Sequence, residues 1–315
     1  MKKLLLIIMS LFILCAVAGC GGSDKAAQEQ KNTAGITVTD DNGRTVTLNG
    51  VPKKIVPLSA SFLEPLEKLD AGLAARVAAK TGISEKYKAL PEVGNVYNVN
   101  IEKVIAAHPD LVICYKDMND KFVHNFEENN IPVIVLEMRT YAQVKNTVSV
   151  FGKITGNEAK AEELNKDMDE RIAAVRAKMP QESKRIAILH STAQNVTVQL
   201  EGSIAGSTAQ LLGFTNIAAG SMPLENNSTA APYSLETLVA ANPDIIYITS
   251  MGKLETVQDA MLKSISASQA WQSLAAVRSG HVYFLPQELF LLSPGIKYPQ
   301  AAEYMAKLAY PEKFE

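Results

Sequence analysis

The sequence predicts two α/β lobes joined by one long helix. Short β-branched runs alternate with helix-length segments in two separate series along the 315 residues, an amphipathic stretch lies between the series, and a block of 13 residues occurs once in each. Alternation of strands and helices is typical of parallel sheets built from βαβ units. We therefore expect one sheet in each half of the chain.

A β-hairpin opens the first series. Residues 36–40 and 45–48 flank Asn42-Gly43, and because Asn and Gly both tolerate a positive φ we expect a type I′ turn. Further strands are predicted in the first series at residues 54–58, 76–79, 111–114 and 132–137. In the second series they are predicted at residues 185–190, 196–200, 245–249 and 281–285.

The stretch between the two series predicts a single helix. Gly156 and Pro180 mark its ends, and about 22 residues give about 33 Å of helix. One alternative is a crossover helix within a single domain. We favour a rigid linking helix, residues 157–180, between an amino-terminal lobe (residues 36–156) and a carboxyl-terminal lobe (residues 181–315). Apolar residues recur at spacings of three or four at Ala161, Leu164, Met168, Ile172, Val175 and Met179.

The amino-terminal sequence predicts an export signal. Lys2 and Lys3 precede an apolar run, residues 4–17, that is shorter than the about 20 residues of a membrane span. The motif Val-Ala-Gly-Cys at residues 17–20 resembles the bacterial lipobox. We expect residues 1–19 to be a lipoprotein signal peptide, Cys20 to carry a lipid that anchors the chain outside the cytoplasm, and residues 20–35 to form a flexible tether. The alternative is a secretory signal with an incidental Cys.

Charge and cysteine content narrow the function classes. Loss of Lys2 and Lys3 changes the formal net charge from −2 to −4, and the remaining basic residues are interspersed with acids, which argues against a nucleic-acid partner. Once Cys15 leaves with the signal and Cys20 is acylated, Cys114 has no partner for an intramolecular disulfide. We expect Cys114 to be buried in its apolar run.

The duplicated block is the most informative feature of the sequence. NIEKVIAAHPDLV at residues 100–112 matches SLETLVAANPDII at residues 234–246 without a gap. Each copy predicts a capping residue, Asn100 or Ser234, then a short helix that Pro ends, then a strand. Glu102 and Glu236 occupy the second helical position, where a carboxylate gains about 0.3–1 kcal/mol from the helix dipole. Two such glutamates, one per lobe, also suit docking to a two-fold symmetric basic partner.

These blocks together resemble the substrate-binding proteins of ABC importers for iron complexes and cobalamin. The resemblance rests on the lipobox, the TVTDDNGR hairpin, the two AAxPD blocks and WQSLAAVR at residues 271–278, and it runs from about residue 35 to the carboxyl end. It implies a class III periplasmic binding protein with two Rossmann-like lobes, a monomer that holds its ligand in the interlobe cleft. It also implies that Glu102 and Glu236 dock onto a permease dimer with its ATPase subunits.

Ligands of open α/β sheets bind beyond the carboxyl ends of the strands, which fixes the candidate binding residues. The resemblance adds that Tyr115 and His190 fall where family members commonly contact the ligand. His190 would ligate the iron if the ligand is haem, with Met138, Met251 or a tyrosine as second axial partner. We expect the ligand to contact Ser61, Tyr97, Tyr115, Lys116, Met138, Arg139, His190, Tyr233, Gln287 and Glu288.

The ligand class follows from charge and from missing motifs. Family members that carry strongly anionic siderophores use several arginines, whereas only Arg139, with Lys116, is well placed here, which favours a less charged ferric siderophore, haem or a corrinoid such as cobalamin. The sequence has no phosphate loop, nucleophile elbow or His-Glu-x-x-His motif, so we expect neither an enzyme nor an intrinsic cofactor. A lipid-anchored sensor or a haem-storage protein is the alternative of another class.

Overall fold

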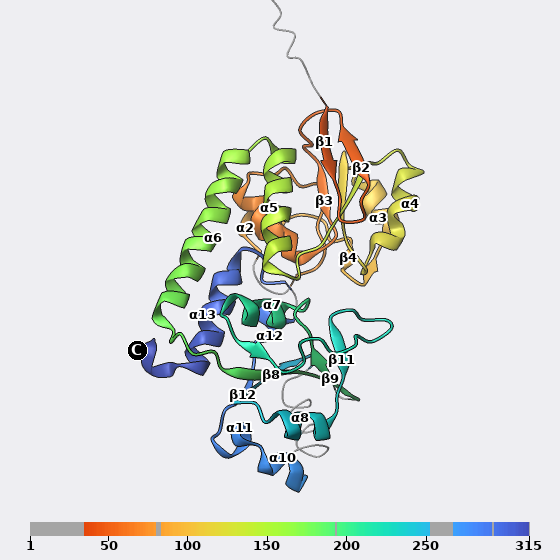
Figure 1. Ribbon diagram of the computed structural model, residues 1–315. Helices are drawn as coiled ribbons and strands as arrows, with labels where there is room; N and C mark the ends of the chain where they lie inside the picture. Colours follow the sequence, from red (N-terminus) through yellow and green to blue (C-terminus); the bar gives the residue numbers. More distant parts are fainter. Residues whose placement is uncertain (1–34, 80–82, 193, 253–266, 292, 315) are drawn as a thin grey trace, which may run out of the picture. The chain divides into compact units, whose positions relative to one another are not determined.

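The computed structural model describes residues 35–314 except 80–82, 193, 253–266 and 292 (Figure 1). The predicted signal peptide, Cys20 and the tether up to residue 34 lie outside the described residues. The described chain contains two separate large sheets. A three-stranded parallel sheet has the order β3 (Ile55–Pro57), β6 (Leu111–Tyr115) and β7 (Val133–Leu136).

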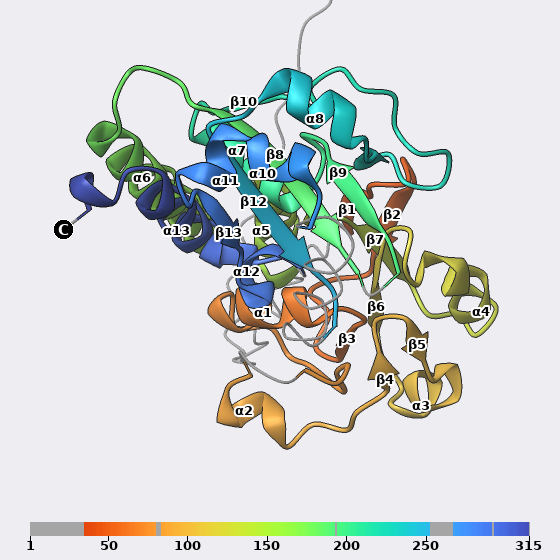
Figure 2. The ribbon, with the colours of Figure 1, turned by 90° about the horizontal axis from the view of Figure 1, so that it is seen from below.

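The second sheet has six strands and mixed directions. Strands β8 (Arg185–Ser191), β12 (Ile245–Ser250) and β13 (Val282–Phe284) are neighbours that run parallel, with β13 at one edge. Beyond β8, β9 (Val196–Gln199) and β11 (Ala230–Pro232) are antiparallel to their neighbours, and β10 (Thr215–Asn216) pairs with β8. Figure 2 shows β8 and β12 side by side at the centre of this sheet. The two predicted α/β series therefore form two sheets.

Helices surround both sheets. In the first half they are α1 (Leu63–Lys68), α2 (Glu85–Lys88), α3 (Ile101–Ala106), α4 (Val123–Glu127) and α5 (Tyr141–Thr155). After α6 (Glu158–Lys178), the second half has α7 (Ile204–Leu211), α8 (Leu235–Ala241), α10 (Gln269–Ser273), α11 (Ala275–Arg278), α12 (Gln287–Phe290) and α13 (Tyr298–Ala309). Four 3-10 turns are η1 (Ala60–Phe62), η2 (Asp120–Phe122), η4 (Gly295–Lys297) and η5 (Pro311–Lys313) among the described residues.

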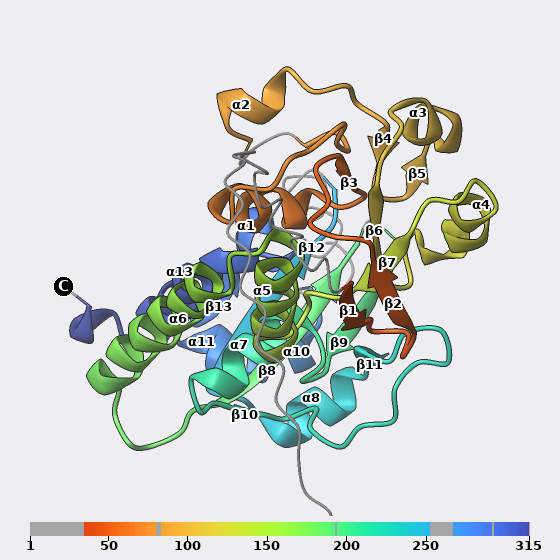
Figure 3. The same cartoon turned by 90° about the horizontal axis from the view of Figure 1, so that it is seen from above.

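The long helix α6 confirms the predicted link between the halves. Of its predicted apolar positions, Ala161, Met168, Ile172 and Val175 are buried. It lies beside α5 and α13, as Figures 1 and 3 show for α5. One apolar core runs from the three-stranded sheet through α5, α6 and α13 to the six-stranded sheet, so the halves also share packing at this side.

Tyr298 ties the two halves together where α13 begins. Its side chain is fully buried, and its hydroxyl lies 2.9 Å from the carbonyl oxygen of Arg139 and 3.2 Å from that of Ile204. Nearby, the Tyr141 backbone N–H donates to Ser207 Oγ at 3.1 Å. Both contacts therefore tie the region after β7 to α7.

Two local predictions about the first half are wrong. The hairpin of β1 (Ile36–Thr39) and β2 (Thr45–Leu48) forms, but only Gly43 in its turn has a positive φ, 76°, so the turn is not type I′. The Asp40 carboxylate accepts the N–H groups of Asn42 and Arg44 and favours a longer turn. Residues 76–79 form no strand: the backbone of Arg76 makes an isolated bridge to Glu92, and its guanidinium donates to the carbonyl oxygens of Tyr87, Val77 and Lys88.

Both copies of the duplicated block fold alike. Asn100 Oδ1 accepts the N–H of Lys103 at 2.9 Å, and Ser234 Oγ accepts that of Thr237 at 3.2 Å, so both predicted caps are confirmed. α3 ends at Ala106 and α8 at Ala241, and the equivalent residues beyond them, His108 (φ 47°) and Asn242 (φ 43°), both have a positive φ.

The aspartates of the repeat explain why its Pro-Asp pair is duplicated. Asp110 accepts the backbone N–H groups of Lys53 and Lys54 at 2.7 and 2.9 Å, beside the start of β3. Asp244 accepts that of Arg185 at 2.8 Å, at the start of β8. Each aspartate therefore fixes the register of the strand that follows it against the neighbouring parallel strand.

Cys114 is buried in β6, as predicted. Its side chain has no solvent exposure, and burial raises the pKa of its thiol well above the usual range. Because a thiolate is the reactive form, this cysteine is an inert core residue.

Candidate functional site

A cavity of about 170 Å³ lies between the carboxyl ends of the two sheets. The three-stranded sheet contributes Tyr115 at the end of β6 and Arg139 after β7, and the six-stranded sheet contributes His190 of β8 and Thr249 of β12. This is the position expected for a ligand of open α/β sheets. The lining residues are Ser59, Ser61, Tyr115, Met118, Arg139, His190, Gln199, Ser203, Ile204, Asn227, Thr229, Thr249, Met251, Phe290, Leu291 and Ser293.

Four of the predicted contact residues meet in this cavity: Ser61, Tyr115, Arg139 and His190. Six others do not line it. Met138 is fully buried in the core, Lys116 Nζ donates to the Asp41 carbonyl at 2.8 Å, and Gln287 Nε2 donates to Gly252 O at 2.7 Å. The remaining three lie apart from the lining, with Tyr233 half-buried and both Tyr97 and Glu288 exposed.

His190 presents one ring nitrogen to the cavity in a defined state. Its Nδ1 lies 2.9 Å from Thr249 Oγ1, and the Thr249 hydroxyl donates its only hydrogen to the Leu189 carbonyl at 3.2 Å. When that hydroxyl donates to Leu189, the hydrogen between ring and hydroxyl sits on Nδ1. Burial lowers the pKa of His190, so the ring is neutral at pH 7 and Nε2 keeps a free lone pair. A neutral imidazole oriented in this way can bind a metal or accept a hydrogen bond.

Tyr115 is held as a neutral phenol. Burial, the largest cause, raises the pKa of Tyr115 to about 12, although the backbone N–H of Met138 donates to its oxygen at 3.3 Å. A tyrosinate that could ligate iron is therefore disfavoured near pH 7. The Tyr115 hydroxyl acts instead as a hydrogen-bond donor at the cavity wall.

Among the described residues of the lining, Arg139 is the one charged side chain, and two carboxylates lie beside it. Its Nε lies 3.1 Å from Glu137 Oε1, and its Nη2 donates to Asp117 Oδ2 at 3.2 Å. Burial raises the pKa of Glu137, and Arg139 opposes this shift. The two carboxylates therefore compensate the positive charge of Arg139 before a ligand binds. The rest of the described lining is uncharged and combines hydroxyl and amide groups with apolar side chains such as Met118 and Phe290.

Sequence reasoning missed the lining residues that enter from helix starts and loops. Ser203 caps α7, where its Oγ accepts the N–H of Gly206 at 2.9 Å, and Phe290 ends α12. Asn227 and Thr229 come from a loop before β11. Gln199 ends β9, which runs antiparallel to β8, so a search limited to the carboxyl ends of parallel strands does not find it.

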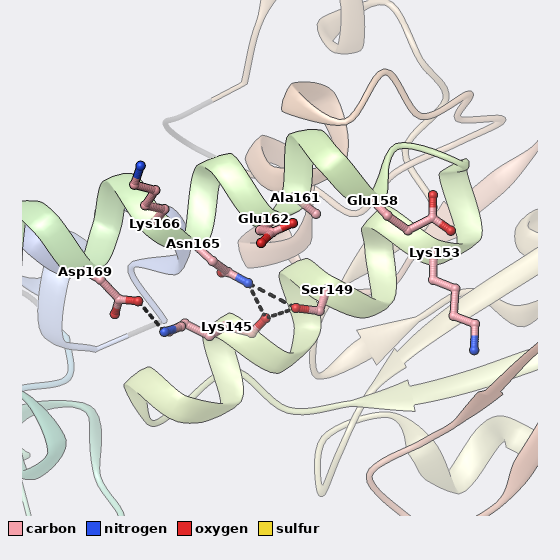
Figure 4. Close-up of a pocket in the computed structure, with 9 residues that line it drawn as sticks. All are labelled: Lys145, Ser149, Lys153, Glu158, Ala161, Glu162, Asn165, Lys166 and Asp169. Carbon is pink, nitrogen blue, oxygen red and sulfur yellow. Dashed lines mark hydrogen bonds and ion pairs between the residues drawn. The ribbon is translucent and has the colours of Figure 1, made fainter.

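A larger open groove of about 740 Å³ lies between α5 and α6 (Figure 4). Asp169 pairs with Lys145 at 2.5 Å, and Asn165 Nδ2 donates to Lys145 O and Ser149 Oγ. These polar side chains are already paired within α5 and α6. The six-stranded sheet contributes no residue to the groove. We therefore place the ligand in the smaller cavity, where both sheets contribute.

The two duplicated glutamates are exposed on separate helices. Glu102 lies in the first turn of α3 and Glu236 in the first turn of α8. Figure 1 shows α3 beside the three-stranded sheet and α8 beside the six-stranded sheet. Each half of the chain thus presents one capped helix start with an exposed carboxylate.

The described residues hold neither a cluster of metal-ligating side chains nor a membrane-spanning helix. Within residues 35–314, outside the gaps given above, no three His, Cys, Asp or Glu side chains gather in a way that would hold a bare metal ion. In the same part of the chain, the helices lack the combination of length and apolar character that a bilayer span needs.

Comparison with known proteins identifies the family. Residues 55–289 match the family model described as periplasmic binding protein, which is about three quarters of the chain. The ABC transporter substrate-binding lipoprotein YvrC of Bacillus subtilis is 25% identical over 98% of this chain and 98% of its own length. The Fe(3+)-citrate-binding protein YfmC of the same organism is 25% identical over 94% of this chain and 93% of its own.

A solved structure agrees on the fold. Staphylococcus aureus IsdE complexed with heme superposes with a TM-score of 0.71 at 21% identity, over 82% of this chain and 98% of that one. The described residues have the same class III arrangement of two α/β lobes joined by a long helix. The chain therefore belongs to the periplasmic binding protein family and is a substrate-binding protein, not an enzyme.

Proposed function

We propose that this protein is the extracytoplasmic substrate-binding component of an ABC importer and that it captures an iron complex, a ferric siderophore or haem. The observation that carries the proposal is the cavity between the carboxyl ends of both sheets, lined by His190 from one sheet and Arg139 from the other. The names of the relatives, a ferric citrate-binding protein and a heme-binding protein, support iron complexes as the ligand class.

The cavity's charge narrows the ligand further. A single compensated arginine among neutral hydroxyl and amide groups offers hydrogen bonds but little net positive charge. Such a wall favours ferric complexes of low net charge, and haem and corrinoids share this property. Cobalamin is therefore the alternative ligand within the same function.

Ligand entry requires the lobes to separate. Cavities that bury ligands of this size typically measure about 300–1,000 Å³, more than the 170 Å³ found here. A hinge motion about the Tyr298 and Tyr141 contacts would widen the cavity while the shared core along α6 and α13 stays packed.

Delivery depends on a membrane anchor and a partner. We propose that lipidated Cys20 anchors the monomer and that residues 20–35 let it reach an ABC permease dimer with its ATPase subunits. Glu102 and Glu236 would each contact a basic group on one permease subunit. A component of an importer needs both the anchor and the pair of docking glutamates. A lipid-anchored sensor would work without a permease and an ATPase.

Absorption titration of the purified protein with haem, cobalamin and a ferric siderophore in turn tests the ligand class. If haem binds through His190, the Soret band shifts on binding and His190→Ala lowers haem affinity by at least about 100-fold, because losing only an outer-shell partner of a metal ligand already costs about 10–100-fold. His124→Ala is the matched control, because His124 lies on α4 with 81% of its side chain exposed. If cobalamin alone binds saturably, the ligand is a corrinoid and not an iron complex. If none of the probes binds, the proposal is refuted.

Haem affinity should also depend on pH in a defined direction. Iron binds the neutral ring, so protonation of His190 competes with haem. Because burial lowers the pKa of His190 below 6.5, affinity should stay constant from pH 8 to pH 6.5 and fall about tenfold per pH unit only below the lowered pKa. The apo protein should lose stability as pH falls below 6.5, because the unfolded chain then binds the extra proton. Haem titrations across pH 5–8 measure the first effect, and an affinity that rises in acid would contradict it.

A further inference from the structure

Glu137 occupies an unusual position behind the cavity wall. Only 11% of its side chain is exposed, and its Oε1 lies 3.1 Å from Nε of Arg139, the charged residue of the lining. Asp117, the other carboxylate on Arg139, is 62% exposed and screened by water. Glu137 is therefore the counter-charge that acts most strongly on Arg139.

The chain holds Glu137 in place through a helix cap. Gln143 Oε1 accepts the backbone N–H of Thr140 at 2.8 Å, and Thr140 Oγ1 accepts that of Gln143, which completes a capping box for α5. The amide nitrogen of the same Gln143 donates to Glu137 Oε2 at 2.8 Å. Glutamate would cap the helix equally well but would face Glu137 with a second negative charge. The use of Gln here fits a carboxylate that must stay charged and fixed.

We propose that Glu137 determines specificity by cancelling the charge of Arg139, so that the cavity prefers ferric complexes of low net charge over anionic ones. Nε and Nη2 of Arg139 face carboxylates, and Nη1 remains to donate hydrogen bonds to an oxygen of the ligand. Arg139 thus contributes directed hydrogen bonds with little net attraction for anions. This inference rests on the proposed capture of iron complexes.

A purely structural role for Glu137 makes a different prediction. If Glu137 only anchored the segment between β7 and α5, Glu137→Gln would weaken all ligands equally or lower stability, because the lost contact does not depend on the ligand. A charge role instead changes the ratio of affinities for anionic and uncharged complexes. The ratio therefore separates the two roles.

The experiment compares ferric dicitrate, an anionic complex, with ferrichrome, an uncharged ferric trihydroxamate, in the full chain and its variants. Glu137→Gln removes the buried negative charge and leaves the shape of the side chain almost unchanged. We expect ferric dicitrate to bind on the order of tenfold more tightly, while the ferrichrome dissociation constant changes less than twofold. Asp117→Asn is the matched control, and its exposed carboxylate should give a much smaller change.

Arg139→Gln provides a second, opposite variant should Glu137→Gln fail to fold. It leaves Glu137 without its cation, so ferric dicitrate should bind at least tenfold more weakly relative to ferrichrome. The inference is overturned if the ratio of affinities for ferric dicitrate and ferrichrome is unchanged in both variants, or if Glu137→Gln and Asp117→Asn change it equally. The proposed function still stands in that case if the wild-type protein binds either probe. If neither the wild type nor any variant binds ferrichrome, ferric dicitrate or haem, both the inference and the proposed function fail.

Discussion

Reversing both duplicated glutamates, Glu102→Lys with Glu236→Lys, should abolish iron uptake in cells and leave the affinity for the iron complex unchanged. Both carboxylates are exposed at the starts of short capped helices, away from the cavity lining. Each lysine would repel a basic permease site and would lose the favourable helix-dipole interaction of about 0.3–1 kcal/mol. Uptake of radiolabelled iron and equilibrium titration of the purified variant measure the two quantities separately.

A matched pair of reversals controls for net charge. Glu163 and Glu170 are exposed on α6, and converting both to lysine changes the formal charge by the same amount. We expect this control to transport at the wild-type rate. If the Glu102 and Glu236 variant instead loses ligand affinity or melts many degrees lower, these glutamates serve the structure rather than docking.

Asn119→Leu should cost about 3–5 kcal/mol of folding free energy and weaken ligand binding. Asn119 has no solvent exposure, and its amide bonds to the Tyr115 N–H (2.8 Å), the Leu58 carbonyl (2.9 Å) and the Val96 carbonyl (3.0 Å). Leucine of similar volume would leave three buried backbone groups unpaired, at about 1–3 kcal/mol each. Denaturant unfolding measures the loss.

The effect on binding follows from where these three groups lie. Leu58 precedes Ser59 of the cavity wall, and Tyr115 belongs to that wall itself. Asn119 therefore positions cavity residues without contacting the ligand. Asn129→Leu is the control, because Asn129 is exposed on the surface and should cost less than about 0.5 kcal/mol. A loss below 1 kcal/mol at Asn119 would show that water replaces its hydrogen bonds.

The strands and the linking helix were predictable because their signals are local. Apolar runs such as residues 111–115 are fully buried, and the three-or-four spacing along α6 sets its packing face. The segment at residues 76–79 was also predicted as a strand, but Arg76 finds its partners farther along the chain, at Tyr87 and Glu92. A prediction based on local pattern has no access to such partners.

The cavity was predictable only in part, for a geometric reason. Tyr115 and His190 lie at the ends of strands β6 and β8, and the carboxyl ends of the strands point to the ligand site. Met138 follows β7 just as closely, yet its side chain turns into the core while that of Arg139, the next residue, lines the cavity. Side-chain direction after a strand depends on the local backbone, which the sequence pattern does not specify.

The central claim is that an iron complex binds between the two sheets beside His190 and Arg139. Anomalous diffraction at the iron edge, from crystals grown with the iron complex that binds most tightly, locates the metal directly. We predict one strong iron peak within the cavity between these two residues. A peak in the groove between α5 and α6, or on the surface with an empty cavity, would contradict the account.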